Sequence, residues 1–147
     1  MSTKWLVTIS EGNFQIALGK ELMGVSGRWR KPLEEMKEGD DIIFYISKKK
    51  VGRGGPRSSV SEFAGLAQVV GPVSLSEERI WHSKGEETFP YQREIKFSAS
   101  VGRAKASEIC HSLEFIKNQD YWMLYLLTVT RKIPDADYET IKRALGK

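Results

Sequence analysis

The apolar residues of this chain fall into short strand-like runs that are not regularly separated by helices, and this order constrains the fold more than any other feature. The runs rich in aromatic and β-branched residues span 5–9, 41–47, 63–70, 89–98 and 121–129. A parallel doubly wound sheet needs strands and helices in alternation, so this order argues against one. It predicts the α+β class: a small curved, mostly antiparallel β-barrel of five to six strands with two to four short flanking helices.

Helix signals and turn residues lie between these runs. Ser10 is followed by Glu11-Gly12-Asn13, which predict the capping region of a short helix, and 135–145 predicts a capped C-terminal helix. Pro32 opens one further helical turn, because proline favours the first position of a helix. Gly71-Pro72 is predicted to end the strand at 63–70, because both residues interrupt regular strand pairing.

Length and composition indicate one soluble domain over 1–147. With 40% hydrophobic and 29% charged residues, the chain can form a core, which excludes the disordered class. No stretch approaches the roughly 20 apolar residues that cross a bilayer, and the first residues lack the apolar core of a signal peptide. We therefore expect a cytoplasmic protein without a membrane partner.

Residues that could catalyse a reaction or hold a metal are sparse. Cys110 is the only cysteine, which excludes an intramolecular disulfide and a multi-cysteine zinc site. His82 and His111 do not have the spacing of a metal-ligand set. Acidic pairs such as Asp40-Asp41 lie in turn-like contexts, which predict solvated carboxylates. The sequence thus predicts no metal, no cofactor and no catalytic residue.

Two cationic segments account for the net charge of +4. Residues 28–31 contribute +3 and residues 48–57 contribute +5, so the rest of the chain carries −4. The second segment lies in 48–61, which we expect to be a flexible basic loop, either simply solvated or used as a phosphate-binding arm. The candidate phosphate contacts are Arg28, Arg30, Lys31, Lys48, Lys49, Lys50, Arg53 and Arg57.

The four tryptophans divide into two kinds. Trp5 and Trp122 lie within predicted strands, where core packing is the expected role. Trp29 stands between cations, so it could stack a base whose phosphates the cations hold, or it could anchor its loop to the barrel. Trp81 lies in an irregular segment, where a large aromatic residue either fills a small core or forms a ligand wall.

Short segments along nearly the whole chain also occur in an order that resembles a known family. They are Trp5-Leu6-Val7-Thr8, 24–30, Pro32-Leu33, 36–40, Ile43-Phe44-Tyr45, 63–67, 87–91, 115–118, Trp122 and Ile133-Pro134 with Asp137-Tyr138. This ordered set resembles the EVE domain family. The resemblance implies a PUA-like fold related to YTH domains.

The resemblance further implies a non-catalytic reader of a modified base in DNA or RNA. YTH relatives hold N6-methyladenine in an aromatic cage, and EVE domains are associated with modified cytosines. In this sequence Met23 stands where many relatives have Trp, and Ser26 stands where Pro is common. The implied pocket residues are Ser10, Met23, Gly24, Val25, Ser26, Arg28, Trp29, Trp81, Phe89, Pro90 and Tyr91. We expect a monomer that binds nucleic acid and that could act with a separate effector such as a nuclease.

Other functions remain open at the level of sequence. An RNA- or DNA-processing enzyme of the PUA-like group would need a general base and a cation, for which Glu86 or Glu87 beside Lys84 is the nearest set. A nucleoside or small-molecule binder could use the same pocket, and the exposed faces could serve a protein-interaction module.

Overall fold

The computed structural model describes residues 2–48, 59–76, 78, 80–81, 88–98, 102–126 and 128–146. The strands in these residues are β1 (Lys4–Ile9), β2 (Leu22–Val25), β3 (Asp41–Lys48), β4 (Ser59–Leu75), β5 (Tyr91–Phe97), β6 (Arg103–Lys105) and β7 (Thr130–Ile133). The α-helices are α1 (Glu11–Lys20), α2 (Arg30–Glu35), α3 (Ala106–Ile109) and α4 (Asp135–Leu145). Short 3-10 helices are η1 (Gly27–Trp29), η3 (Cys110–Ser112) and η4 (Gln119–Leu126).

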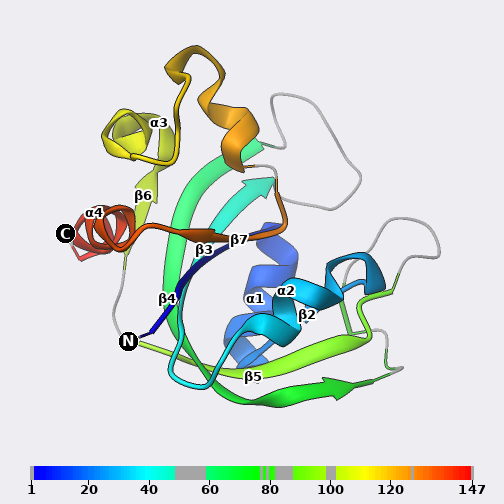
Figure 1. The fold of residues 1–147 in the computed structure, drawn as a ribbon. Coiled ribbons are helices and arrows are strands. Elements are labelled where there is room, and N and C mark those ends of the chain that lie inside the picture. Colours follow the sequence, from blue (N-terminus) through cyan, green and yellow to red (C-terminus); the bar gives the residue numbers. More distant parts are fainter. Residues whose placement is uncertain are drawn as a thin grey trace.

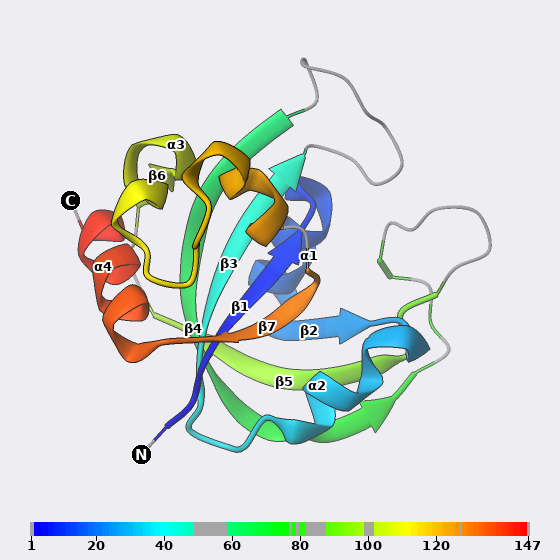
Figure 2. The ribbon, with the colours of Figure 1, turned by 45° about the horizontal axis from the view of Figure 1, so that its top comes forward.

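The strands form one curved sheet in the order β2-β5-β4-β3-β1-β7, and β6 pairs with β4 outside this path. Among the strands of the described residues, β1 and β3 pair in parallel and the other pairs are antiparallel. The long β4 bends through both halves of the sheet, and α1 lies in the hollow (Figures 1 and 2). The predicted α+β class and mostly antiparallel arrangement are confirmed. The described part of the chain contains seven strands rather than five or six, and the path is open because β2 and β7 do not pair.

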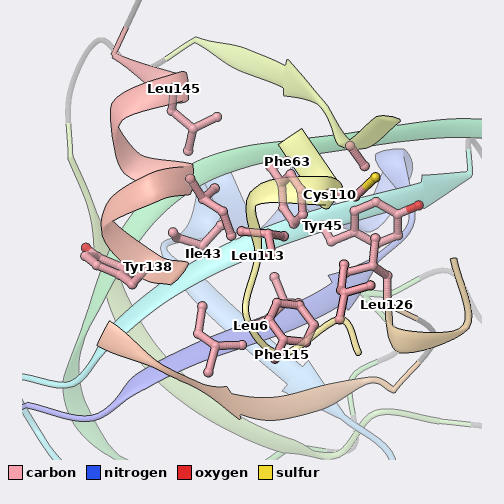
Figure 3. Close-up of a cluster of buried hydrophobic side chains, with 14 of the residues drawn as sticks. Leu6, Ile43, Tyr45, Phe63, Cys110, Leu113, Phe115, Leu126, Tyr138 and Leu145 are labelled. Atoms are coloured by element: carbon pink, nitrogen blue, oxygen red, sulfur yellow. The ribbon is translucent and has the colours of Figure 1, made fainter. Parts of the chain in front are cut away.

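Both faces of the central strands are buried, which explains why β3 is an uninterrupted apolar run. Ile42 and Phe44 of β3 pack in an inner cluster with Phe14 of α1. Ile43 and Tyr45 point to the opposite face and pack in a second cluster with residues of α4 and of the segment before it. Figure 3 shows this second cluster between the sheet and the helices. The sheet is therefore the middle layer, with α1 and α2 on one side and α3 and α4 on the other.

The strand predicted at 121–129 is wrong, because most of this segment forms the 3-10 helix η4. The reason lies just before it: the side-chain oxygen of Asn118 accepts a hydrogen bond from the backbone N–H of Asp120 at 3.1 Å. This local turn competes with an extended backbone and starts the helix. Trp122 still contacts the second cluster, so core packing is confirmed for it although its strand is not.

Gly71-Pro72 does not end a strand, contrary to the sequence prediction, because β4 continues to Leu75. The pairing of β4 with β5 shifts register between Val69 and Val73, so the proline falls in an irregular stretch where its missing N–H is tolerated. Arg93 of β5 stabilises this stretch: its Nε and Nη2 donate to the carbonyl of Gly71 at 3.0 and 2.7 Å. Arg93 is only 6% exposed.

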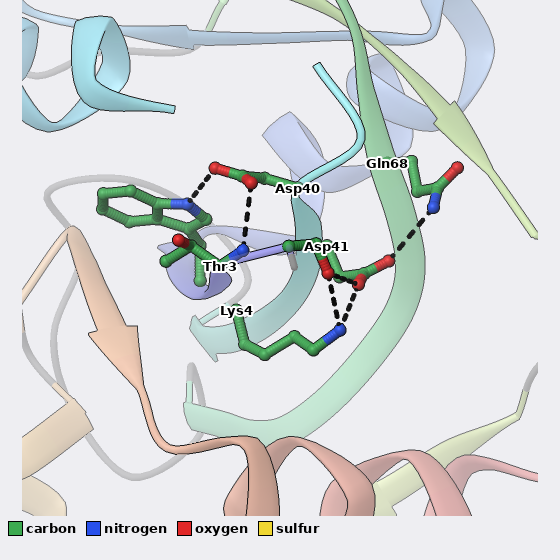
Figure 4. Close-up of polar contacts among 7 residues, drawn as sticks. Thr3, Lys4, Asp40, Asp41 and Gln68 are labelled. Carbon is green, nitrogen blue, oxygen red and sulfur yellow. Dashed lines mark hydrogen bonds and ion pairs between the residues drawn. The ribbon is translucent and has the colours of Figure 1, made fainter. Parts of the chain in front are cut away.

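Asp40 and Asp41 are structural rather than solvated, so that prediction is also wrong (Figure 4). The buried Asp40 carboxylate accepts hydrogen bonds from Thr3 N and Trp5 Nε1, both at 3.0 Å, and from Lys37 N at 2.9 Å. Burial acts to raise the pKa of Asp40, but these donors hydrogen-bond its ionised form and lower the pKa overall. Asp41 pairs with Lys4, and the network fixes the start of β1 against β3.

The basic loop predicted at 48–61 overlaps a strand at each end. Lys48 belongs to β3 and residues 59–61 belong to β4, whereas 49–58 lie outside the described residues. The phosphate contacts predicted at Lys49, Lys50, Arg53 and Arg57 therefore concern residues that the structure does not describe. Within the described ranges, no helix has both the length and the apolar character required to cross a bilayer.

Candidate functional site

A cavity of about 480 Å³ lies where strand ends from both edges of the open sheet approach each other. The last residues of β1, β2 and β3 contribute to its wall, together with Val129 just before β7 and the first turn of α1. This volume is typical of small-ligand sites. The lining residues are Thr8, Ile9, Ser10, Asn13, Gly24, Val25, Ser26, Arg28, Trp29, Ser47, Lys48, Trp81, Phe89 and Val129.

Most of the residues predicted for a pocket do line this cavity. They are Ser10, Gly24, Val25, Ser26, Arg28, Trp29, Trp81 and Phe89. Lys48, predicted as a phosphate contact, also lines it. Five lining residues near the ends of elements were not predicted from the sequence: Thr8, Ile9, Asn13, Ser47 and Val129. Only the fold reveals that these ends meet, although the hydroxyls that end apolar strand runs are a weak sequence signal.

Met23, Pro90 and Tyr91 do not line the cavity, and their placement there is corrected. Met23 is 1% exposed and packs in the inner cluster, on the face of β2 opposite to Gly24. The ring centroid of Tyr91 instead lies 5.7 Å from the guanidinium carbon of Arg30, and Tyr91 packs against the inner cluster.

Aromatic side chains form part of the cavity wall. Trp29 is half-buried and packs against the inner cluster, so it anchors its segment and lines the cavity at once. The guanidinium carbon of Arg28 lies 5.8 Å from the Trp29 ring centroid, a cation–π geometry at the rim. The sequence allowed two roles for Trp81, filling a small core or forming a ligand wall. The structure shows both features, because Trp81 is buried and also lines the cavity.

Gly24 is what allows Trp81 to lie where it does. A Cβ at position 24 would lie 2.6 Å from Nε1 and 2.8 Å from Cε2 of the Trp81 indole. No side chain fits at these distances unless the indole moves. Trp81 is 8% exposed, and its Nε1 has no hydrogen-bond partner among the residues that the structure describes.

The first turn of α1 also faces the cavity. Ser10 is the N-cap of this helix, and its Oγ accepts a hydrogen bond from Asn13 N at 3.3 Å. The hydroxyl expected at the mouth is therefore a buried capping group that still lines the cavity. Glu11 in the same turn is paired with Arg103, with 2.7 Å between Arg103 Nη2 and Glu11 Oε2. It does not line the cavity.

The cavity is electropositive. Arg28 and Lys48 line it, the N-terminus of α1 adds the positive end of a helix dipole, and no lining residue in the described ranges is acidic. The other two cations at 28–31 lie outside the wall: Arg30 pairs with Glu34 at 3.0 Å, and Lys31 is exposed. Such a site suits a ligand with aromatic faces, hydrogen-bond acceptors and a neighbouring negative charge.

The residues considered for catalysis or as metal ligands are mostly ones that the structure does not describe: Lys84, Glu86, Glu87 and His82 lie outside the described residues. His111 is exposed, and burial raises the pKa of the neighbouring Cys110 thiol. Across the described ranges, no group of three or more His, Cys, Asp and Glu side chains could hold a metal ion.

The model of the EVE domain family matches residues 3–144 of the chain. The protein belongs to the EVE domain family. Its relatives include a UPF0310 protein of Pyrococcus abyssi, 30% identical over 96% of this chain and 98% of the relative. Another UPF0310 protein, of Pyrococcus horikoshii, is 25% identical over 97% of this chain and 99% of the relative. The resemblance found in the sequence is thus confirmed.

The fold of this EVE domain is shared with YTH domains. A solved YTH domain of the Zygosaccharomyces rouxii MRB1 protein, in complex with N6-methyladenosine RNA, superposes with a TM-score of 0.66. The match covers 99% of this chain and 87% of that domain at 15% sequence identity. At this identity the similarity establishes a common architecture, as the family resemblance implied.

Proposed function

We propose that this EVE domain is a non-catalytic nucleic-acid-binding module that holds one modified base, a cytosine or adenine derivative, in the cavity. The chemistry of the lining is the observation that supports the proposal. Aromatic rings, hydroxyl groups and two cations surround a space of about 480 Å³, and no described lining residue is acidic. A base offers flat faces and edge acceptors, and its polymer supplies the phosphates. The similarity to a YTH domain in complex with N6-methyladenosine RNA supports the same use of the fold.

The affinities expected of such a site follow from opposing contributions. Turning a base out of a duplex costs a few kcal/mol, and stacking it on an aromatic side chain recovers roughly 1–3 kcal/mol. One methyl group in an apolar slot adds only about 1–3 kcal/mol of discrimination. We therefore propose partial specificity for the modification, with phosphate contacts supplying much of the affinity.

Arg28 and Lys48 are the cations best placed for those phosphates, because both line the cavity from different elements. Arg28 lies in η1 and Lys48 ends β3, so a backbone passing over the opening would meet cations from two separate elements. Lys31 is exposed on α2 and extends this charge away from the opening.

A fluorescence-anisotropy titration tests the proposal with duplexes and single strands that carry one 5-methylcytosine or one N6-methyladenine. The expected result is about tenfold tighter binding of one modified strand than of its unmodified counterpart, lost in Trp81→Ala. Tyr121→Ala is the matched control, since Tyr121 is 61% exposed and does not line the cavity. Equal affinity for all strands, unchanged in Trp81→Ala, would refute a reader function. Full binding of a free modified nucleoside without salt dependence would instead identify a nucleoside-binding protein.

A further inference from the structure

Trp81 carries a hydrogen-bond donor that the fold leaves unused. Its side chain is more than nine-tenths buried, yet its Nε1 has no partner among the described residues. Trp5 is the contrasting case, because its Nε1 donates to Asp40 Oδ2 at 3.0 Å. A buried donor without a partner is costly, so the unpartnered indole of a cavity-lining residue points to a ligand.

The surroundings of the indole limit where it can move. The edge that bears Nε1 lies against Gly24, where even a single added carbon would be 2.6 Å away. Trp81 and Gly24 both line the cavity of about 480 Å³. A rotation toward the cavity would break no hydrogen bond of Nε1 within the described structure, and it would bring the donor to a bound ligand.

The chemistry of the wall favours an acceptor at this point. Arg28 and Lys48 are donors, the N-terminus of α1 adds positive potential, and no described lining residue is a carboxylate. Every nucleobase presents acceptors on its edges, either ring nitrogens or carbonyl oxygens. We propose that a base bound in the cavity accepts a hydrogen bond from the indole N–H of Trp81, which turns from Gly24 toward the cavity to donate it.

This inference rests on the proposed function and adds a specificity-determining contact to it. Stacking alone tolerates any base, since every base has a π-face. A directed N–H instead selects bases by the position of their acceptor, because a base whose acceptor lies elsewhere on its edge leaves the donor unpaired. Trp81 would then recognise an acceptor on the edge of the base in addition to packing against the base.

Nitrogen–proton correlation NMR of the four tryptophan indoles tests the contact directly. The probes are a DNA strand and an RNA strand that carry 5-methylcytosine or N6-methyladenine, with unmodified strands beside them. Trp81→Phe removes one resonance and so assigns it. On saturation with a strand that binds, the Trp81 indole proton is expected to move downfield, as on forming a hydrogen bond. The indole resonance of Trp5, bonded to Asp40, serves as the internal reference and should stay in place.

Trp81→Phe keeps an aromatic ring at the wall but lacks the donor, and its affinity for that strand is expected to fall roughly 3- to 10-fold. Thermal unfolding checks that this variant is folded, and the wild-type NMR result stands without it. Two results together would show that the inference is wrong while the reader function stands. They are a strand that binds without moving the Trp81 proton downfield, and wild-type affinity for that strand in Trp81→Phe. If the wild type prefers no modified strand, the reader function itself fails and the inference with it.

Discussion

At the scale of single residues, Gly24 is the position where one added carbon most directly alters the site. Gly24→Ala is expected to displace the Trp81 indole and lower the free energy of unfolding by about 1–3 kcal/mol, the usual cost of overpacking. Urea denaturation measures the change. Gly19→Ala is the matched control, because a Cβ at Gly19 meets nothing within 4 Å and alanine favours a helix. An equal loss in both variants would contradict the role of the Gly24–Trp81 contact.

Asp40 gives a pH dependence whose sign follows from its hydrogen bonds. Its pKa lies below the ordinary value of 3.8 because three donors outweigh the effect of burial. The ionised carboxylate therefore stabilises the fold above about pH 4, and this stabilisation is lost as the pH falls through the lowered pKa. The pKa of Asp41 is also lowered. Burial acts to raise it, but hydrogen bonds from Lys4 and Ser2 to the carboxylate outweigh that effect.

The measurement is the free energy of unfolding between about pH 6 and pH 2, by urea denaturation. Stability should decline toward the acid end, and Asp40→Asn should flatten the decline while costing about 1–3 kcal/mol at neutral pH. Asp120→Asn is the control, since Asp120 is exposed in η4. If the free energy of unfolding of Asp40→Asn declined toward acid pH as steeply as that of the wild type, other groups would cause the acid sensitivity.

At the scale of elements, Arg93 joins three pieces of structure that are distant in sequence. Besides the carbonyl of Gly71 in β4, its guanidinium donates to the carbonyls of Leu33 and Met36 at the end of α2. Burial lowers the pKa of Arg93. This one side chain therefore holds α2 against the irregular stretch of β4, next to the segment that supplies Arg28 to the cavity.

Arg93→Lys tests this connection, because a lysine cannot reproduce the forked hydrogen bonds to several carbonyls. We expect the free energy of unfolding to fall by about 3 kcal/mol, since buried carbonyls lose their donors. Hydrogen exchange should accelerate at the amides of α2 and β4 more than at those of α4. Arg143→Lys is the control, on the exposed face of α4. Unchanged exchange in α2 would show that other contacts hold it.

Element prediction failed where backbone interactions competed with side-chain pattern. The alternation at 121–129 resembles a strand, but the turn at Asn118 begins a helix that leaves Tyr121, Met123 and Leu124 exposed. Gly71-Pro72 resembles a strand end, but the buried Arg93 supports an irregular stretch and β4 continues. The short strands β2 and β7 have four residues each, too few for a period to be recognised.

At the scale of the whole molecule, the separation of charge predicts salt-dependent binding. The slope of log Kd against log salt concentration should decrease by about one when either Arg28→Gln or Lys48→Gln removes a phosphate contact. Anisotropy titrations across a range of sodium chloride concentrations measure the slope. Lys117→Gln is the control, since it removes an exposed cation that does not line the cavity. Equal slopes for all three variants would place the phosphates elsewhere.

The sequence by itself determined the fold class, the family and most of the cavity wall. Apolar order is a property of the chain, so the strands at 5–9 and 41–47 were predictable, as was the α+β class. Ser10, Gly24, Trp29 and Trp81 were predicted as pocket residues through the family resemblance, and they do line one cavity. Their binding of a base remains a prediction.

Tertiary structure alone decided which side chains face that cavity and which are buried in the core. Met23 and Gly24 are neighbours in sequence, but the pairing of β2 with β5 sends the first into the core and leaves the second against Trp81. Asp40 became a buried structural carboxylate because β1 brought Thr3 and Trp5 to it. The physical reason is that facing and burial depend on partners distant in the chain, which no local pattern records.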